Sequence, residues 1–168
     1  MPGKVYYQEL EDWNRNAAFY EQQNESPFQQ ILLEQMTQTY GLSDCGGMLL
    51  DLGGGVGSFA SRLDGAGTVA LCVDFSMEML LAARRRNPRI RCLCASADSL
   101  PFRESSFAAA VCNGTLHHVK VQDLLPEAVK ELVRVLRPGA TLCIQDRHNG
   151  AMSNLAEAAL GSLKTMHR

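Results

Sequence analysis

The sequence predicts an α/β fold: a parallel sheet of about five strands with flanking helices. Two observations carry this prediction. Short apolar segments typical of buried strands recur along the chain, and segments with helical character fill the gaps between them. This alternation calls for parallel strands joined by right-handed crossovers. A chain of 168 residues is long enough to enclose one sizeable core, so a single domain is expected.

The expected strands are short, largely apolar segments that end in glycine or polar residues. They are Met48–Leu52, Val69–Val73, Ile90–Cys94, Phe107–Cys112 and Ala140–Ile144. In open parallel sheets of this kind, ligands bind beyond the carboxyl ends of the strands, where the strand order reverses. Residues directly after each strand are therefore the candidates for a functional site.

Helices are expected ahead of the first strand and between the later ones. Ser26 and Pro27 form a helix-start signal, because serine caps the first turn and proline suits the first helical position. Gly41 ends that helix. Within it, Phe28, Ile31, Leu32, Gln35 and Met36 follow at helical spacing. The other expected helices are Trp13–Tyr20, Ser58–Leu63, Met77–Arg86, Leu124–Leu136 and Ala151–Lys164.

The domain 1–168 is expected to have three parts: a helical cap over 1–44, an α/β core over 45–146 and a C-terminal helix over 147–168. No strand is evident after Ile144, so the fifth strand would lie at an open edge with unpaired backbone groups. We therefore expect self-association through that edge, or a chain that is a fragment or shortened form of a longer enzyme.

Composition excludes several classes of protein. The net charge is −2, with 46% hydrophobic and 20% charged residues, as in ordinary globular proteins. No apolar run approaches the roughly 20 residues that span a bilayer, and no secretory signal opens the chain, so a cytoplasmic protein is expected. The basic run Arg84–Arg86 is interpreted as a solvated helix end rather than a nucleic-acid surface. Six cysteines without C-x-x-C spacing are interpreted as core thiols, and no metal is expected.

A glycine-rich turn follows the first expected strand. Residues 51–57 read Asp-Leu-Gly-Gly-Gly-Val-Gly. Glycine allows tight turns with positive φ and lets a ligand approach the backbone. Asp51 is placed where it could accept a hydrogen bond from an ammonium group.

Acidic residues follow the next two strands. Asp74 ends the second, where an acidic side chain can hold both hydroxyls of a ribose. Phe75 would then lie against an adenine ring. Asp98 follows the third strand and could accept from an adenine amino group, although Asp-Ser before Leu-Pro is also an ordinary turn.

Candidate catalytic residues follow the fourth and fifth strands. His117 and His118 could serve as a base or contact a substrate, although a histidine here is as often structural. Because they are adjacent, their side chains are expected to point apart, which argues against joint metal ligation. Asp146 and His148 would lie at the rim of the same crevice, as substrate contacts or loop residues.

Together these segments resemble the class I S-adenosylmethionine-dependent methyltransferases, a Rossmann-like family, and in particular the small-molecule type. The resemblance runs from Met48 to Asp146, and the order and spacing of its segments are more specific than any one of them. The segments are LLDLGGGVG, VDFSMEML, ASADSLPF, FAAAVCNGTLHHV and ELVRVLRPGATLCIQD.

The resemblance implies S-adenosyl-L-methionine as cofactor and a role for each matching residue. Asp51, Gly53 and Gly55 would hold the methionine end, and Asn113 would touch it from the fourth strand. Asp74 would hold the ribose. The adenine would lie between Phe75 and Met79, with its edge read by Ala97 and Asp98. The implied reaction is direct displacement at the sulfonium methyl, with a small-molecule acceptor and no metal.

Departures from the family pattern leave alternatives open. Asn113-Gly114-Thr115-Leu116 is not the Asn/Asp-Pro-Pro-Tyr/Phe of enzymes that methylate amino groups of nucleobases or glutamine, which disfavours those acceptors. The family's sixth and seventh strands are not evident, so a catalytically inactive module that binds the cofactor or a partner remains open. A nicotinamide-dependent oxidoreductase also fits Gly55–Ala60, which match G-x-G-x-x-A, together with Asp74.

Overall fold

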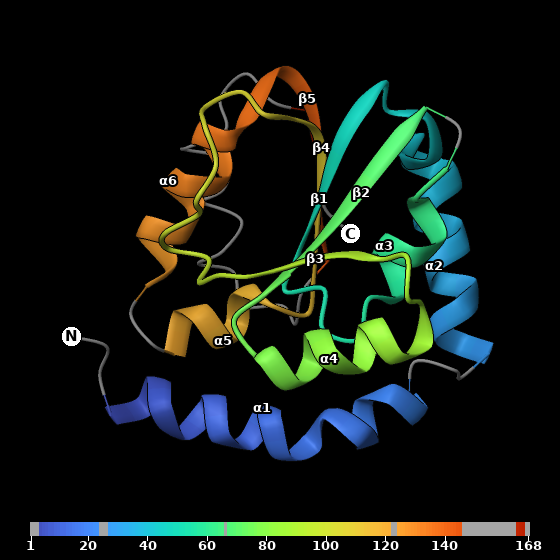
Figure 1. Cartoon of the computed structure of the whole chain (residues 1–168). Helices are drawn as coiled ribbons and strands as arrows, with labels where there is room; N and C mark the ends of the chain where they lie inside the picture. Colours follow the sequence, from blue (N-terminus) through green and yellow to red (C-terminus); the bar gives the residue numbers. More distant parts are fainter. Residues whose placement is uncertain (1–3, 24–26, 66, 122–123, 146–163, 167–168) are drawn as a thin grey trace.

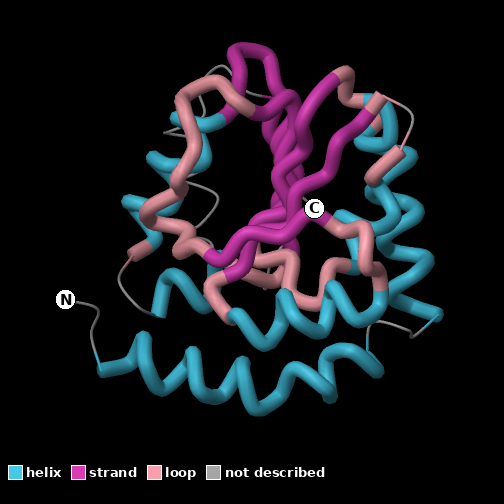
Figure 2. Tube along the Cα trace, viewed as in Figure 1, coloured by secondary structure: helices cyan, strands magenta, loops and turns pink. Residues whose placement is uncertain are grey.

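The computed structural model describes residues 4–23, 27–65, 67–121, 124–145 and 164–166. A parallel sheet stands at the centre, with helices on both of its faces (Figures 1 and 2). Helices α5 and α6 cover one face, and α2, α3 and α4 cover the other. Helix α1 runs across the end of the sheet, beside α4.

The helices and strands are bounded as follows. The helices are α1 (Lys4–Gln23), α2 (Pro27–Tyr40), the short 3-10 helix η1 (Leu42–Asp44), α3 (Ser58–Leu63), α4 (Met77–Arg86), α5 (Leu116–Val121) and α6 (Leu125–Val135). The strands are β1 (Gly47–Leu52), β2 (Thr68–Asp74), β3 (Arg91–Cys94), β4 (Phe107–Asn113), β5 (Leu136–Gln145) and β6 (Lys164–Met166).

The sheet has the strand order β3-β2-β1-β4-β5-β6, and each neighbouring pair is parallel. The predicted parallel sheet of five strands with flanking helices is therefore confirmed. The chain moves outward from β1 to β3 and then returns to the other side of β1 with β4. The order thus reverses between β1 and β4, and a crevice is expected at their carboxyl ends.

The predicted absence of a sixth strand is wrong for the described residues. Lys164–Met166 form β6, which pairs with Thr141, Leu142 and Cys143 of β5. The pairing supplies hydrogen-bond partners to an edge that would otherwise stay open. That part of the β5 edge is therefore paired, and self-association through β5 stays a prediction. The C-terminal helix predicted over 147–168 lies mostly outside the described residues, and where the structure describes it, at 164–166, it is a strand.

Strand β5 begins earlier than the sequence indicated. It starts at Leu136, directly after α6, although Pro138 and Gly139 were expected to precede the strand. Leu136 pairs with Phe107, and the register then shifts so that Thr141 pairs with Ala109. Such an irregularity accommodates proline, which cannot donate to the sheet, and Gly139 at φ 78°.

Two apolar cores lie on the two faces of the sheet, and alternate residues of each strand supply them. From β1, Leu50 and Leu52 join the core beneath α5 and α6, whereas Leu49 joins the core beneath α2, α3 and α4. This double-sided burial explains why the strands are continuously apolar in sequence. The six cysteines are all free; Cys72, Cys112 and Cys143 are buried, and Cys94 is exposed.

Two local helix predictions need correction. In α2 the buried residues include Leu33 and Met36, while Ile31 is 56% exposed and Gln35 is also exposed. Of the expected residues, Met36 is therefore buried, whereas Ile31 and Gln35 face solvent. Helix α5 was not predicted, because six residues are too few to show a helical period.

Among the described residues, no helix is both long and apolar enough to cross a membrane.

Candidate functional site

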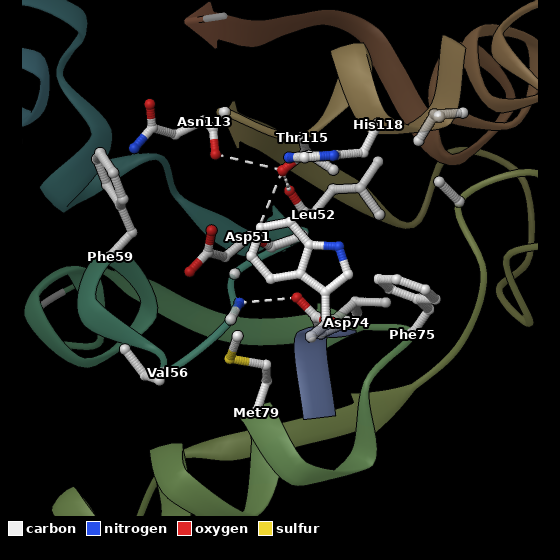
Figure 3. A pocket seen from close by; sticks show the side chains of 18 of the residues that line it. Asp51, Leu52, Val56, Phe59, Asp74, Phe75, Met79, Asn113, Thr115 and His118 are labelled. Carbon is white, nitrogen blue, oxygen red and sulfur yellow. Dashed lines mark hydrogen bonds between the residues drawn. The ribbon is translucent and has the colours of Figure 1, made fainter. Parts of the chain in front are cut away.

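A cavity of about 370 Å³ lies at the carboxyl ends of β1, β2 and β4, where the strand order reverses (Figure 3). Most of the residues predicted to hold a cofactor line it. These are Asp51, Gly53, Gly55, Asp74, Phe75, Met79, Ala97 and Asn113. Asp98 is not among the residues that line the cavity.

The glycine turn between β1 and α3 forms the floor of the cavity. Gly53 and Gly54 donate their backbone N–H groups to the Val73 carbonyl at 2.7 and 3.2 Å, which fastens the turn to β2. Gly53, Gly55 and Gly57 have φ values of 68°, 52° and 73°, a region that glycine enters without strain. A methyl group on Gly53 would overlap the Thr115 side chain. The turn therefore depends on glycine for its conformation and, at Gly53, for space.

Asp51 presents a buried carboxylate at the end of β1. Its side chain is almost fully buried, and Oδ2 accepts the Ala60 N–H at 3.0 Å. Burial raises the pKa of Asp51 to about 7; the Ala60 hydrogen bond opposes this shift, and nearby Asp74 adds to it. A cationic group bound beside Asp51 would favour the ionised carboxylate and reverse the shift.

This raised pKa predicts that binding of a ligand with an ammonium group weakens below pH 7. In the free protein Asp51 is protonated below about pH 7, so binding must first release a proton. The affinity should fall by up to about tenfold for each pH unit below that value. Burial also raises the pKa of Asp74, which acts in the same direction. Calorimetric titration with S-adenosylhomocysteine between pH 5.5 and 7.5 measures the slope, and Asp51→Asn should make it shallower. Equal slopes in the two proteins would contradict the assignment to Asp51.

Asp74 links the glycine turn to the start of α4. Oδ2 accepts the Gly55 N–H at 2.9 Å, and Oδ1 accepts the Ser76 N–H at 2.9 Å. The side chain is 8% exposed and lines the cavity (Figure 3). A carboxylate oxygen can accept more than one hydrogen bond, so both oxygens retain capacity for hydroxyl donors.

Helix α1 is fastened over this part of the site. The Ser76 hydroxyl caps α4 by accepting the Met79 N–H at 3.2 Å, and it donates to Asn14 Oδ1 of α1 at 2.6 Å. Ala17 of α1 packs with Val56 and Met79 in a small apolar cluster. The N-terminal helix therefore closes one side of the cavity.

The connection after β3 contributes its first residues to the cavity. Ala95, Ser96 and Ala97 line it, while the Asp98 carboxylate accepts a hydrogen bond from the Ser96 hydroxyl. Asp98 is half-buried. The predicted role of Asp98 in reading an adenine edge stays a prediction.

Thr115 is a site residue that the sequence interpretation missed. Its hydroxyl lies 3.3 Å from the Leu52 carbonyl and 3.2 Å from the Asn113 carbonyl, which ties the end of β4 to the glycine turn (Figure 3). The signal in the sequence is weak, because one threonine between a strand and a short helix carries no motif of its own.

One wall of the cavity is aromatic. Trp13 contacts the His118 ring edge-to-face at a centroid distance of 4.7 Å, and it lies 4.9 Å from the Tyr20 ring. His117 and His118 also line the cavity, from α5. Their rings lie 3.9 Å apart, so the prediction that they point apart is wrong: both rings turn toward the same side of this short helix. Asp146 and His148 lie outside the described residues and stay predictions.

Comparison with known proteins places this geometry in a family. A family model described as a methyltransferase domain matches residues 50–144. The 2-phytyl-1,4-naphthoquinone methyltransferase of Nostoc punctiforme is 35% identical over 147 residues, which are 81% of this chain and 63% of that protein. A malonyl-[acyl-carrier protein] O-methyltransferase of Pectobacterium atrosepticum is 34% identical over 66% of this chain and 42% of its own length. The chain thus spans less than two thirds of each relative.

Solved structures agree on the fold. The phosphoethanolamine N-methyltransferase 2 of Haemonchus contortus, solved with S-adenosylhomocysteine, superposes with a TM-score of 0.70 at 19% identity, over 87% of this chain and 41% of that one. The predicted class of cofactor, S-adenosylmethionine, is confirmed at the level of the family, and the nicotinamide alternative is disfavoured. The chain belongs to the methyltransferase domain family, whose enzymes are the class I S-adenosylmethionine-dependent methyltransferases.

Proposed function

We propose that this protein transfers the methyl group of S-adenosylmethionine to a small-molecule acceptor. The observation that carries the proposal is the charge of the cavity. Two buried carboxylates, Asp51 and Asp74, flank the glycine turn, and no lysine or arginine is present among the described residues that line the cavity. Buried carboxylates call for a cation or for hydrogen-bond donors. S-adenosylmethionine has both, since it carries an ammonium group, a sulfonium and ribose hydroxyls.

The residues of the chain fit the parts of this cofactor. Asp51 would accept from the ammonium group and Asp74 from the ribose hydroxyls. The backbone of Gly53 and Gly55 allows close approach of the methionine end. Phe75 and Met79 would enclose the adenine on two sides, and Asn113 would contact the methionine portion. When bound, the cofactor supplies a sulfonium methyl group that a nucleophile displaces directly.

The chain contributes mainly alignment and exclusion of water. Trp13 and Tyr20 of α1, together with α5, enclose part of the cavity. A nucleophile held there in line with the methyl group would react as in an intramolecular step. His117 and His118 are candidates to contact the acceptor or to accept its proton. The aromatic wall favours an acceptor with a flat apolar part.

Turnover tests this proposal. The protein is incubated with S-adenosylmethionine and, in separate reactions, a reduced naphthoquinone, a malonyl thioester and phosphoethanolamine, and S-adenosylhomocysteine is quantified. The first two acceptors follow from the names of the relatives. Formation of product with at least one acceptor, absent in Asp74→Ala, is the expected result. Binding of cofactor without turnover on any acceptor would favour the inactive module.

The single tryptophan offers a direct report on the cavity. Trp13 is the only tryptophan in the sequence, and it lines the cavity. Saturation with S-adenosylhomocysteine should change its emission, because indole emission depends on the polarity and the packing of its surroundings. The midpoint should equal the calorimetric dissociation constant. Trp13→Phe should abolish the signal and change the affinity by less than about fivefold. An unchanged emission at calorimetric saturation would place the ligand away from Trp13.

A further inference from the structure

Two charged side chains of α6 fasten the connection between β3 and β4. Arg134 donates from Nη1 to the Phe102 carbonyl at 2.7 Å and from Nη2 to the Leu100 carbonyl at 2.9 Å. Glu131 Oε2 accepts the Leu100 N–H at 2.7 Å. Both peptide groups around Leu100 are thus held by one helix.

The two side chains also hold each other. Arg134 Nε lies 2.6 Å from Glu131 Oε1, and Nη2 lies 2.8 Å from Oε2. This bidentate geometry fixes the planes of both groups. The hydrogen bond from Arg134 is the main cause of the lowered pKa of Glu131, so the carboxylate is charged at neutral pH. Both side chains are partly exposed, at 36% and 20%, and pairs of that kind add little to stability. Their clearer effect is on the position of the backbone that they bind.

That backbone leads directly into the cavity. On the strand side, the Ala95 N–H donates to the Asp74 carbonyl at 3.0 Å. A turn follows, in which the Ser99 N–H donates to the Ser96 carbonyl at 3.2 Å. The segment that lines the cavity, Ala95–Ala97, is therefore held between β2 on one side and the Leu100 anchor on the other. Its placement depends on both anchors.

We propose that Glu131 and Arg134 are positioning residues that set the segment Ala95–Ala97 against the nucleobase of the cofactor and so determine nucleobase selectivity. The inference rests on the proposed function, because it takes this cavity as the cofactor site. Neither side chain is among the residues that line the cavity, so both act through the Leu100 backbone.

The test compares two ligands that differ only at the nucleobase. S-adenosylhomocysteine has an exocyclic amino group, whereas S-inosylhomocysteine has an oxygen there. We expect the unmodified protein to prefer the adenine ligand by at least about tenfold, the effect of about one well-placed hydrogen bond. Arg134→Met should lower affinity for the adenine ligand about tenfold and leave affinity for the inosine ligand within about twofold.

Further variants on α6 separate positioning from general stability. The affinity of Arg134→Lys for the adenine ligand should lie between those of the unmodified protein and Arg134→Met. One ammonium group cannot bind both carbonyls and both carboxylate oxygens. Arg134→Lys also replaces Arg134→Met if that variant does not fold. Lys130→Met removes an exposed cation of the same helix, whose only described partner is Glu127 at 3.8 Å, and should leave both affinities unchanged.

A measurement without ligand keeps the inference apart from the proposed function. Amide hydrogen exchange of Ser99 and Leu100 should accelerate at least about tenfold in Arg134→Met relative to Lys130→Met. If Arg134→Met loses affinity for both ligands equally, or keeps its selectivity, the inference is overturned while the proposed function stays intact. Unchanged exchange at Leu100 would also overturn it. If the unmodified protein binds neither ligand, the proposed function fails, and the inference about selectivity fails with it.

Discussion

Replacing Asp74 by alanine is expected to weaken S-adenosylhomocysteine binding by about 100-fold or more. A hydrogen bond to a charged group contributes about 1.5–3 kcal/mol, and Asp74 is proposed to make two of them to the ribose. Each 1.4 kcal/mol corresponds to about tenfold in affinity. The substitution also removes the acceptor for the Gly55 and Ser76 N–H groups, which lie 2.9 Å from its two oxygens. The glycine turn would therefore lose a contact as well.

Asp64→Ala is the matched control. Asp64 follows α3 and bonds to β2: its carboxylate accepts from Arg91 at 2.8 Å and from the Ala70 N–H at 3.0 Å, and it does not line the cavity. Calorimetric titration of both variants, with circular dichroism to confirm folding, gives the comparison. A well-folded Asp74→Ala protein that binds within about fivefold of the unmodified protein would contradict the ribose assignment.

Gly53→Ala is expected to lower the free energy of unfolding by about 3 kcal/mol and to remove cofactor binding. Gly53 has φ 68°, where a residue with a side chain costs about 1–2 kcal/mol. The added methyl group would also overlap the Thr115 side chain, which is itself hydrogen-bonded to the Leu52 and Asn113 carbonyls. Urea unfolding measures the loss, and a decrease of the melting temperature by roughly 6–12 °C should accompany it.

Gly46→Ala isolates the contribution of the overlap. Gly46 has the same φ of 68°, but nothing lies within 4 Å of a methyl group there, and it is outside the cavity. In this variant the free energy of unfolding should fall only by the conformational cost of a side chain at positive φ, about 1–2 kcal/mol. The variant should bind S-adenosylhomocysteine normally. Equal destabilisation of the two variants would show that contact with Thr115 adds nothing.

The sequence predicts the central sheet well because local signals and tertiary requirements agree there. Leu49 and Leu50 are both buried, on opposite faces of β1, and this is what a continuous apolar strand indicates. The glycine turn was also predictable, since positive φ at Gly53 and Gly57 restricts the residue type. The positions of Asp51 and Asp74 then follow from where their strands end.

The remaining features depend on contacts that no short segment encodes. Helix α5 has six residues, too few to show a helical period in the sequence, and it is held by packing. Thr115, which precedes this helix, and the orientation of His117 within it were therefore missed. Strand β6 has three residues and forms by pairing with the edge of β5. The role of Arg134 becomes visible only when α6 and the connection after β3 lie side by side. In each case the decisive partner is distant in sequence.

The central claim, a cofactor site for S-adenosylmethionine in this cavity, is tested most directly by calorimetric titration of the chain with S-adenosylhomocysteine, with NAD as the control. We expect one site of micromolar affinity for S-adenosylhomocysteine and no binding of NAD. The Trp13 emission should change over the same range of ligand concentration. Absence of S-adenosylhomocysteine binding, or equal binding of NAD, would show that the cavity is not a site for S-adenosylmethionine.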